Sequence, residues 1–199
     1  MTEQIVKAPE QQKKQPAAWV PVVLIGLRLL LICAVVAGIV SLVYAVTKPK
    51  AEENLREEKR KAIISIFGTD ELTYAESADA AGIYVVTLPG DGGTCYCLES
   101  TAGGFGGDLT LMVGYRADGT VAGVSVVSHS ETPGLGARVN DAEYLSQYAG
   151  KSGDLTLNKD GGNDIDAISG ATISSRAVLS AVNAATERLR TYLAGGAAQ

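Results

Sequence analysis

The sequence is poor in residues that bind metals or exchange disulfides. Its 199 residues include three cysteines, Cys33, Cys95 and Cys97, and one histidine, His129. These residues show no zinc-ligand spacing and do not form the cysteine set of an iron–sulfur cluster, so we expect no metal site. Cys95 and Cys97 lie two residues apart in a strand-like segment. They would share one face of that strand, either as small core residues or as a redox pair or cluster ligands.

Positive charge is scarce beyond the first third of the chain. Residues 69–199 contain sixteen acidic and seven basic residues, whereas residues 1–68 contain six acidic and ten basic residues. An acidic domain repels a phosphate backbone, which argues against a nucleic-acid partner. The sequence also lacks a nicotinamide-binding fingerprint. It lacks the G-x-S-x-G elbow that would support a hydrolase with Ser130 or Ser169 as nucleophile and His129 as base.

One long apolar segment stands near the N-terminus. Residues 19–46 are apolar apart from Arg28 and Ser41, and residues 29–46 alone would form a helix roughly 27 Å long, enough to cross a bilayer core. We therefore predict a single transmembrane helix over 19–46, preceded by a short cytoplasmic tail over 1–18. A cleaved signal peptide is disfavoured because the apolar segment is too long and no small-x-small cleavage site follows it.

Residues 47–68 are expected to form an amphipathic linker helix after the span. Its apolar residues fall on one face: Leu55, Ala62, Ile63, Ile66 and Phe67. The basic residues around the span favour a cytoplasmic domain, since six lysines and arginines follow it closely, against three lysines and Arg28 before it.

The remaining residues, 69–199, are expected to form one α+β domain with antiparallel strands and flanking helices. Two well-alternating strands over 109–115 and 121–127 are joined through Asp118-Gly119, a strong hairpin signal. Further strands are predicted over 83–88, 95–99 and 155–158, and helices over 139–148 and 174–193.

Three segments of this domain could line a site. The first is a glycine run, 103–107, which would let the backbone approach a flat ligand or would simply form a flexible turn. The second, 129–136, gathers the only histidine, an acid, two hydroxyls and two glycines after a strand, where binding loops often lie, although a polar turn is equally expected. The third, 166–174, is rich in hydroxyl groups and runs into the last helix.

The third segment places Thr172 at a helix N-terminus. Backbone N–H groups there have no intrahelical acceptor and the helix dipole is positive, so a phosphate would be stabilised at this position. The alternative is that the Ser and Thr residues only cap the helix.

These motifs, in this order behind an N-terminal span, closely resemble the G subunit of the Rnf complex. They are also similar to the C subunit of the sodium-pumping NADH:quinone reductase. The resemblance implies an FMN-binding domain in which FMN is attached covalently, through its phosphate, to Thr172. It implies that a flavin transferase uses FAD for this attachment and recognises the motif formed by Asp166, Ser169, Gly170 and Ala171.

The resemblance also implies where the flavin pocket lies and what the chain does. The candidate pocket residues are Gly106, Gly107, His129, Glu131, Thr132, Leu135, Gly136 and Ser174. The family would place the domain outside the cytoplasm, against the basic-residue bias, on a single-pass membrane anchor in contact with lipid. The chain would relay electrons among the other membrane and redox subunits of a ferredoxin:NAD+ oxidoreductase that translocates Na+ or H+. Its span has no acidic residue for an ion path.

Two alternative functions stay open from the sequence. One is the FMN subunit of the sodium-translocating NADH:quinone reductase. The other is a membrane-tethered binding module without redox activity, whose Ser/Thr run caps a helix.

Overall fold

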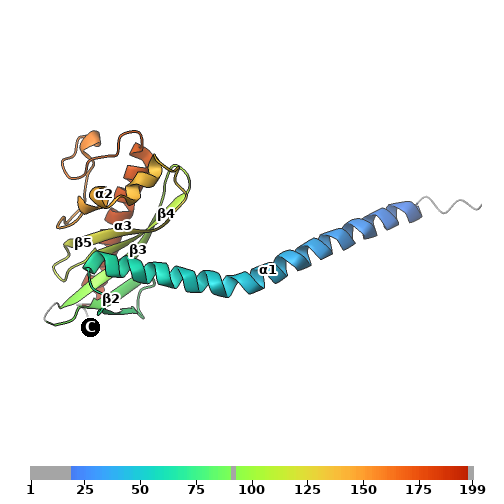
Figure 1. The fold of residues 1–199 in the computed structure, drawn as a ribbon, viewed down its shortest axis with the longest axis horizontal. Coiled ribbons are helices and arrows are strands. Elements are labelled where there is room, and N and C mark those ends of the chain that lie inside the picture. The colour runs from blue at the N-terminus through green and yellow to red at the C-terminus, as the bar shows by residue number, and fades with distance from the viewer. Residues whose placement is uncertain (1–18, 91–92, 197–199) are drawn as a thin grey trace, which may run out of the picture. The chain divides into compact units, whose positions relative to one another are not determined.

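The computed structural model describes residues 19–90 and 93–196, so the tail predicted over 1–18 lies outside the described residues. The chain divides into two compact units, residues 1–53 and 54–199. Figure 1 shows the fold and labels the elements where there is room. In chain order the elements of the chain are α1 (Trp19–Phe67), β1 (Thr73–Glu76), β2 (Ile83–Thr87), β3 (Thr94–Gly103), β4 (Asp108–Tyr115), β5 (Val121–His129), η1 (Gly136–Asn140), α2 (Ala142–Ser146), η2 (Asn158–Asp160) and α3 (Thr172–Gly196).

Helix α1 contains the apolar segment. Among the described residues it is the one helix long and apolar enough to cross a membrane, with an 18-residue stretch of mean hydropathy 2.8. Its large apolar side chains over 22–46 are exposed within this chain. The helices expected separately over 19–46 and 47–68 form one element, which continues through Pro49. Proline lacks an N–H donor, so the hydrogen-bond ladder of α1 is interrupted there.

The second unit is built on a five-stranded antiparallel sheet in which neighbours in sequence are neighbours in space. This arrangement confirms the predicted α+β class with antiparallel strands and flanking helices. The β4–β5 hairpin turns at Asp118-Gly119 as expected. Gly119 has a positive φ of 81°, and the Asp118 carboxylate accepts a 2.9 Å hydrogen bond from the Thr120 N–H. Strand β1 was not predicted, because its short sequence TYAE is largely exposed and lacks an apolar pattern.

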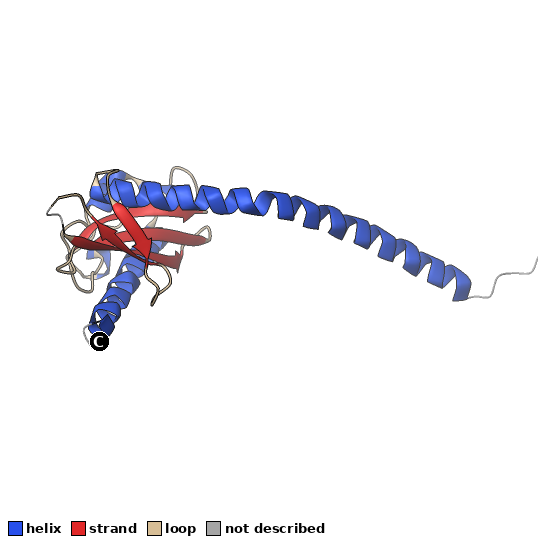
Figure 2. Cartoon of the chain, turned by 90° about the horizontal axis from the view of Figure 1, so that it is seen from below, coloured by secondary structure: helices blue, strands red, loops and turns tan. Residues whose placement is uncertain are grey.

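Helices cover both faces of this sheet, as Figure 2 shows for the red strands between two blue helices. Helix α3 packs on one face through a stripe with helical spacing, Val178, Val182, Ala185 and Leu189. On the other face, Ala62 and Ile63 of α1 pack against strand residues. Each large side chain buried in this way contributes about 1.5–3 kcal/mol to folding.

Cys95 and Cys97 lie on the face of β3 that packs against the end of α1. Both thiols are buried and free of disulfides. Desolvation by burial raises the pKa of both, most strongly that of Cys97. A thiol held protonated is a poor nucleophile, so their environment agrees with the core-residue interpretation and not with a redox pair.

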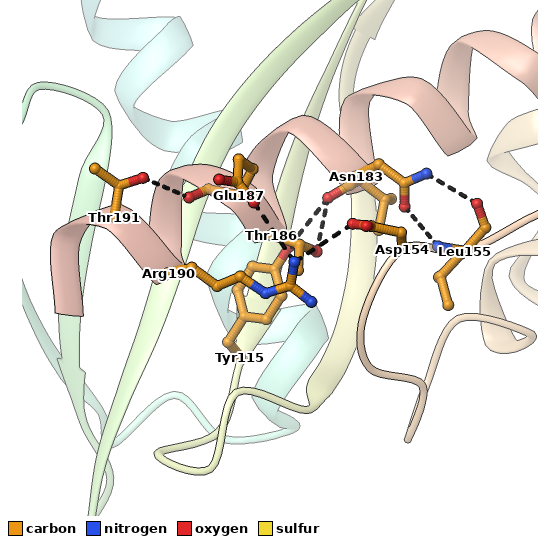
Figure 3. Close-up of polar contacts among 9 residues, drawn as sticks. Tyr115, Asp154, Leu155, Asn183, Thr186, Glu187, Arg190 and Thr191 are labelled. Carbon is orange, nitrogen blue, oxygen red and sulfur yellow. Dashed lines mark hydrogen bonds and ion pairs between the residues drawn. The ribbon is translucent and has the colours of Figure 1, made fainter. Parts of the chain in front are cut away.

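Polar contacts tie α3 to the sheet and to the loop after α2 (Figure 3). The buried Tyr115 hydroxyl lies 2.9 Å from the Thr186 hydroxyl, and burial raises the Tyr115 pKa to about 12. The Asn183 amide accepts a 3.0 Å hydrogen bond from the Leu155 N–H and donates a 2.9 Å bond to the Leu155 carbonyl. These bonds fix the start of the loop that carries η2.

The region between β5 and α3 differs from the prediction, which placed one helix and one strand there. The helix expected over 139–148 is divided into η1 and α2, because Asp141 between them is extended at φ −66° and ψ 132°. The strand expected over 155–158 is reduced to one bridge between Leu157 and Ile165. A short apolar segment can form its backbone hydrogen bonds in a strand, in a helical turn or in a single bridge, and the apolar pattern alone does not distinguish these structures.

Candidate functional site

Three segments that are far apart in sequence meet around one cavity of about 240 Å³. They are the glycine loop between β3 and β4, the loop after β5, and the start of α3. Residue Lys159 of η2 completes the wall. The lining residues are Phe105, Glu131, Thr132, Leu135, Gly136, Lys159, Gly170, Ala171, Thr172, Ile173 and Ser174. A larger hollow of about 860 Å³ lies under the C-terminal half of α3, but no residue of the three predicted segments lines it.

The carboxylate of Glu131 joins all three segments. Oε1 accepts a 2.8 Å hydrogen bond from the backbone N–H of Phe105, and Oε2 accepts a 2.9 Å bond from the Ser174 hydroxyl. Glu131 is only 5% exposed and Ser174 is 1% exposed. Hydrogen bonds to a buried carboxylate are among the stronger ones in proteins. Glu131 therefore holds the glycine loop and the first turn of α3 in a fixed relation.

The glycines of the two loops are needed because these loops approach so closely. A Cβ on Gly104 would overlap Oε1 of Glu131, and a Cβ on Gly136 would overlap Oε2 of the same carboxylate. A Cβ on Gly106 would overlap the backbone carbonyl oxygen of Ser130. The glycine run therefore packs closely against the loop after β5 and is not only a flexible turn.

Substitution of Gly106 by alanine is expected to force the two loops apart, because backbone atoms of Ser130 cannot yield as a flexible side chain can. We expect a loss of about 1–3 kcal/mol in the free energy of unfolding, measured by chemical denaturation of the detergent-solubilised chain. Gly103→Ala is the matched control, since no atom lies within 4 Å of its added Cβ. Equal stability of the two variants would contradict the proposed contact.

Thr172 is the first residue of α3 and lines the cavity. The first hydrogen bond of the helix runs from the Ser175 N–H to the Ala171 carbonyl, at 2.9 Å. The N–H groups of residues 172–174 therefore have no acceptor within the helix. The ammonium of Lys159 donates a 2.8 Å hydrogen bond to the Thr172 Oγ1. The positive end of the helix dipole and the Lys159 ammonium thus both lie next to the hydroxyl of the half-buried Thr172.

The other residues of the 166–174 segment shape the turn before the helix. Gly170 has a positive φ of 83°, and a Cβ there would lie 3.0 Å from Cδ1 of Leu135. The Asp166 carboxylate accepts a 2.6 Å hydrogen bond from the Asn158 side chain, and the Asp166 N–H donates a 2.7 Å bond to Gln147. Asp166 and Ser169 are exposed and do not line the cavity.

The structure brings together most of the predicted site residues. Eight line the cavity: Glu131, Thr132, Leu135, Gly136, Gly170, Ala171, Thr172 and Ser174. Gly106 and Gly107 lie in the adjoining glycine loop. His129 does not line the cavity, and its Nδ1 lies 3.3 Å from the Glu131 N–H, which donates to it. Among the described residues, neither Ser130 nor Ser169 hydrogen-bonds His129, so the geometry offers no support for the hydrolase interpretation.

Three lining residues were not among the individually predicted site residues: Phe105, Ile173 and Lys159, of which the first two lie inside predicted segments. Phe105 stood out in sequence as the aromatic residue within the glycine run, and Ile173 could have been found as an apolar side chain inside the motif. Lys159 carried no such signal, because one lysine in a polar loop is indistinguishable from a solvated surface charge.

Comparisons with known proteins agree with this architecture. The family model described as the FMN-binding domain matches residues 104–187, which include every predicted site residue. The crystal structure of the C subunit of the Na+-translocating NADH-quinone reductase from Parabacteroides distasonis is similar with a TM-score of 0.54 at 20% identity. This likeness covers 68% of this chain and 92% of that one, and shows the fold alone.

Two curated relatives match over most of their length. The G subunit of the proton-translocating ferredoxin:NAD+ oxidoreductase complex of Clostridium ljungdahlii is 30% identical over 167 residues, which cover 82% of this chain and 89% of the relative. The G subunit of the ion-translocating oxidoreductase complex of Erwinia tasmaniensis is 32% identical over 190 residues, covering 83% and 89%. The chain therefore belongs to the family of the G subunits of ion-translocating oxidoreductase complexes.

Proposed function

We propose that this chain is the membrane-anchored electron-transfer subunit of an ion-translocating ferredoxin:NAD+ oxidoreductase complex, and that it carries FMN as a phosphoester on Thr172. The observation that carries the proposal is the position of the Thr172 hydroxyl, which lines the cavity at a helix N-terminus, 2.8 Å from the Lys159 ammonium. The match to the FMN-binding domain and the named relatives support it.

The residues around the cavity fit the two chemically different halves of FMN. Helix amides without an intrahelical acceptor and a lysine suit a phosphate group. A flat aromatic ring system suits an apolar wall, and Phe105, Leu135 and Ile173 at the cavity are 68%, 46% and 51% exposed. Exposed apolar side chains grouped around a cavity are typical of a ligand-binding site. The two glycines that line the cavity, Gly136 and Gly170, place backbone, and not side chains, against this space.

The attachment would consume FAD, in a reaction catalysed by a separate flavin transferase. Thr172 Oγ1 forms a bond to the flavin-side phosphorus, the pyrophosphate bond of FAD breaks, the hydroxyl proton is released, and AMP leaves. No oxidant or reductant is needed. The turn that contains the exposed Ser169 and Gly170 leads directly into Thr172. Because Thr172 is only half-buried, its hydroxyl would be accessible to the transferase.

Bound FMN would supply both one-electron and two-electron transfer. The sequence offers no nicotinamide fingerprint and no iron–sulfur cysteine set. This chain would therefore exchange electrons only with the other redox subunits of the complex, while α1 holds it among the membrane subunits and lipid. Because the apolar span lacks acidic residues, the ion path is assigned to the partner subunits.

The mass of the intact chain tests the proposal. Coexpression with a flavin transferase should raise the mass by that of FMN less one water, and the denatured band should fluoresce under ultraviolet light. An unmodified mass and a dark band under these conditions would contradict the proposal and favour a binding module without redox activity.

We further propose that the domain lies outside the cytoplasm. This follows the family resemblance against the basic residues after the span, a weak bias that the membrane subunits of a complex can override. A phosphatase reporter active only outside the cytoplasm, fused after residue 199, should be active. Activity of a reporter that works only in the cytoplasm, fused at the same site, would reverse this orientation.

A further inference from the structure

The three residues of η2 contact three successive parts of the segment around Thr172. The Asn158 amide donates a 2.6 Å hydrogen bond to the Asp166 carboxylate at the start of the motif. Lys159 donates to the Thr172 hydroxyl at its end, at 2.8 Å. The Asp160 carboxylate accepts two hydrogen bonds from Arg176 of α3, at 2.9 and 2.6 Å. Consecutive residues of one short turn thus hold both ends of the motif and the following helical turn.

The charges in this arrangement are distributed unequally. Arg176 is paired in a two-bond fork with Asp160, and the hydrogen bonds from Arg176 hold the Asp160 carboxyl pKa below its ordinary value. Lys159, in contrast, forms no ion pair within 4.0 Å among the described residues, and its side-chain hydrogen-bond partner is the neutral Thr172 hydroxyl. Lys159, which has no carboxylate as a hydrogen-bond partner, therefore lies at the atom that would carry the phosphate.

The turn that presents Lys159 is well fixed. The backbone of Leu155 is anchored to Asn183 of α3 by two hydrogen bonds. The Thr156 N–H and hydroxyl both donate to Asp164, at 2.9 and 2.6 Å. Gly161 ends η2 in the left-handed conformation with φ of 88°. An otherwise exposed lysine is thus attached to a backbone whose position is set on both sides.

We propose that Lys159 is a positioning residue whose ammonium binds the phosphodiester formed on Thr172, with η2 as the turn that holds it there. This inference rests on the proposed attachment of FMN to Thr172. Esterification removes the hydroxyl proton and adds one negative charge shared by two non-bridging oxygens, which are better acceptors than the hydroxyl. A lysine has three N–H donors and binds phosphate as a point charge.

The test compares Lys159→Gln, Lys159→Glu and Lys159→Arg in the full chain, using purified flavin transferase and FAD. We expect the initial rate of FMN incorporation, followed by intact mass, to fall about tenfold in Lys159→Gln. The fall should be larger in Lys159→Glu and small in Lys159→Arg. Lys151→Gln, which removes a lysine from the same loop region away from the cavity, is the control and should keep the wild-type rate.

A second measurement reports on the phosphate itself. The ³¹P resonance of the flavinylated chain should differ between wild type and Lys159→Gln when folded, and should coincide when both are denatured. Equal rates in all variants with the same folded ³¹P resonance would overturn the inference. A slower rate with an unchanged resonance would also overturn it, since Lys159 would then act on the transferase. A wild-type chain that never gains mass would overturn the proposed function as well.

Discussion

Substitution of Thr172 by alanine is expected to abolish covalent flavin incorporation completely. Alanine has no hydroxyl to form the phosphoester, and the two other hydroxyls in the first turn of α3 are poorly placed to replace it. Ser174 and Ser175 are buried, and their hydroxyls already bond Glu131 and the Ala171 carbonyl. The intact mass should be that of the unmodified polypeptide, and the fluorescent band of the denatured chain should disappear.

Two variants make this result specific. Thr172→Ser keeps a hydroxyl on the same atom and should retain covalent flavin. Ser180→Ala removes an exposed hydroxyl further along the same helix and should leave incorporation unchanged. A flavin-loaded Thr172→Ala chain would instead locate the attachment at another residue, which peptide mapping would identify.

Truncation of the Glu131 side chain to alanine is expected to have the largest effect on stability. Glu131→Ala leaves the Phe105 N–H and the Ser174 hydroxyl without their partner in a buried position and opens a space between the two loops. We expect the free energy of unfolding to fall by about 3 kcal/mol and the melting midpoint by roughly 8 °C. Circular dichroism of the solubilised chain during heating measures this change.

Glu131→Gln is the matched control for the geometry of this bridge. A glutamine carbonyl can accept from the Phe105 N–H while its amide donates to the Ser174 hydroxyl, so both loops stay connected. Its stability should lie much closer to wild type than that of the alanine variant. If the two variants were equally stable, Glu131 would not join the loops in the way described.

Much of the fold could be predicted because its local signals agree with its packing. The hairpin at Asp118-Gly119 and the apolar stripe of α3 needed no knowledge of distant residues. The short elements between residues 136 and 160 could not be predicted, because their form depends on contacts made elsewhere. The two hydrogen bonds between the Asn183 amide and the backbone of Leu155, for example, join residues 28 positions apart.

The site residues that belong to a sequence motif could be predicted. The contacts between segments that are distant in sequence could not. The resemblance identified Thr172 and the loop around Glu131, and Thr172 lines one cavity together with four residues of that loop. The contact between Gly106 and the Ser130 backbone, and the approach of Lys159 to Thr172, arise from segments brought together by the sheet. A single sequence contains no pattern that reports such a contact.

The end of α1 has a practical consequence for the biogenesis and handling of the protein. Ala62 and Ile63 are 4% and 0% exposed in the core of the second unit, beside Cys97 and Met112 of the sheet. The end of α1, which follows the apolar span, thus also covers one face of the sheet. A soluble fragment for crystallisation must start at about Asn54, where the second unit begins. A fragment trimmed to β1 would lose its cover and expose an aggregation-prone apolar surface.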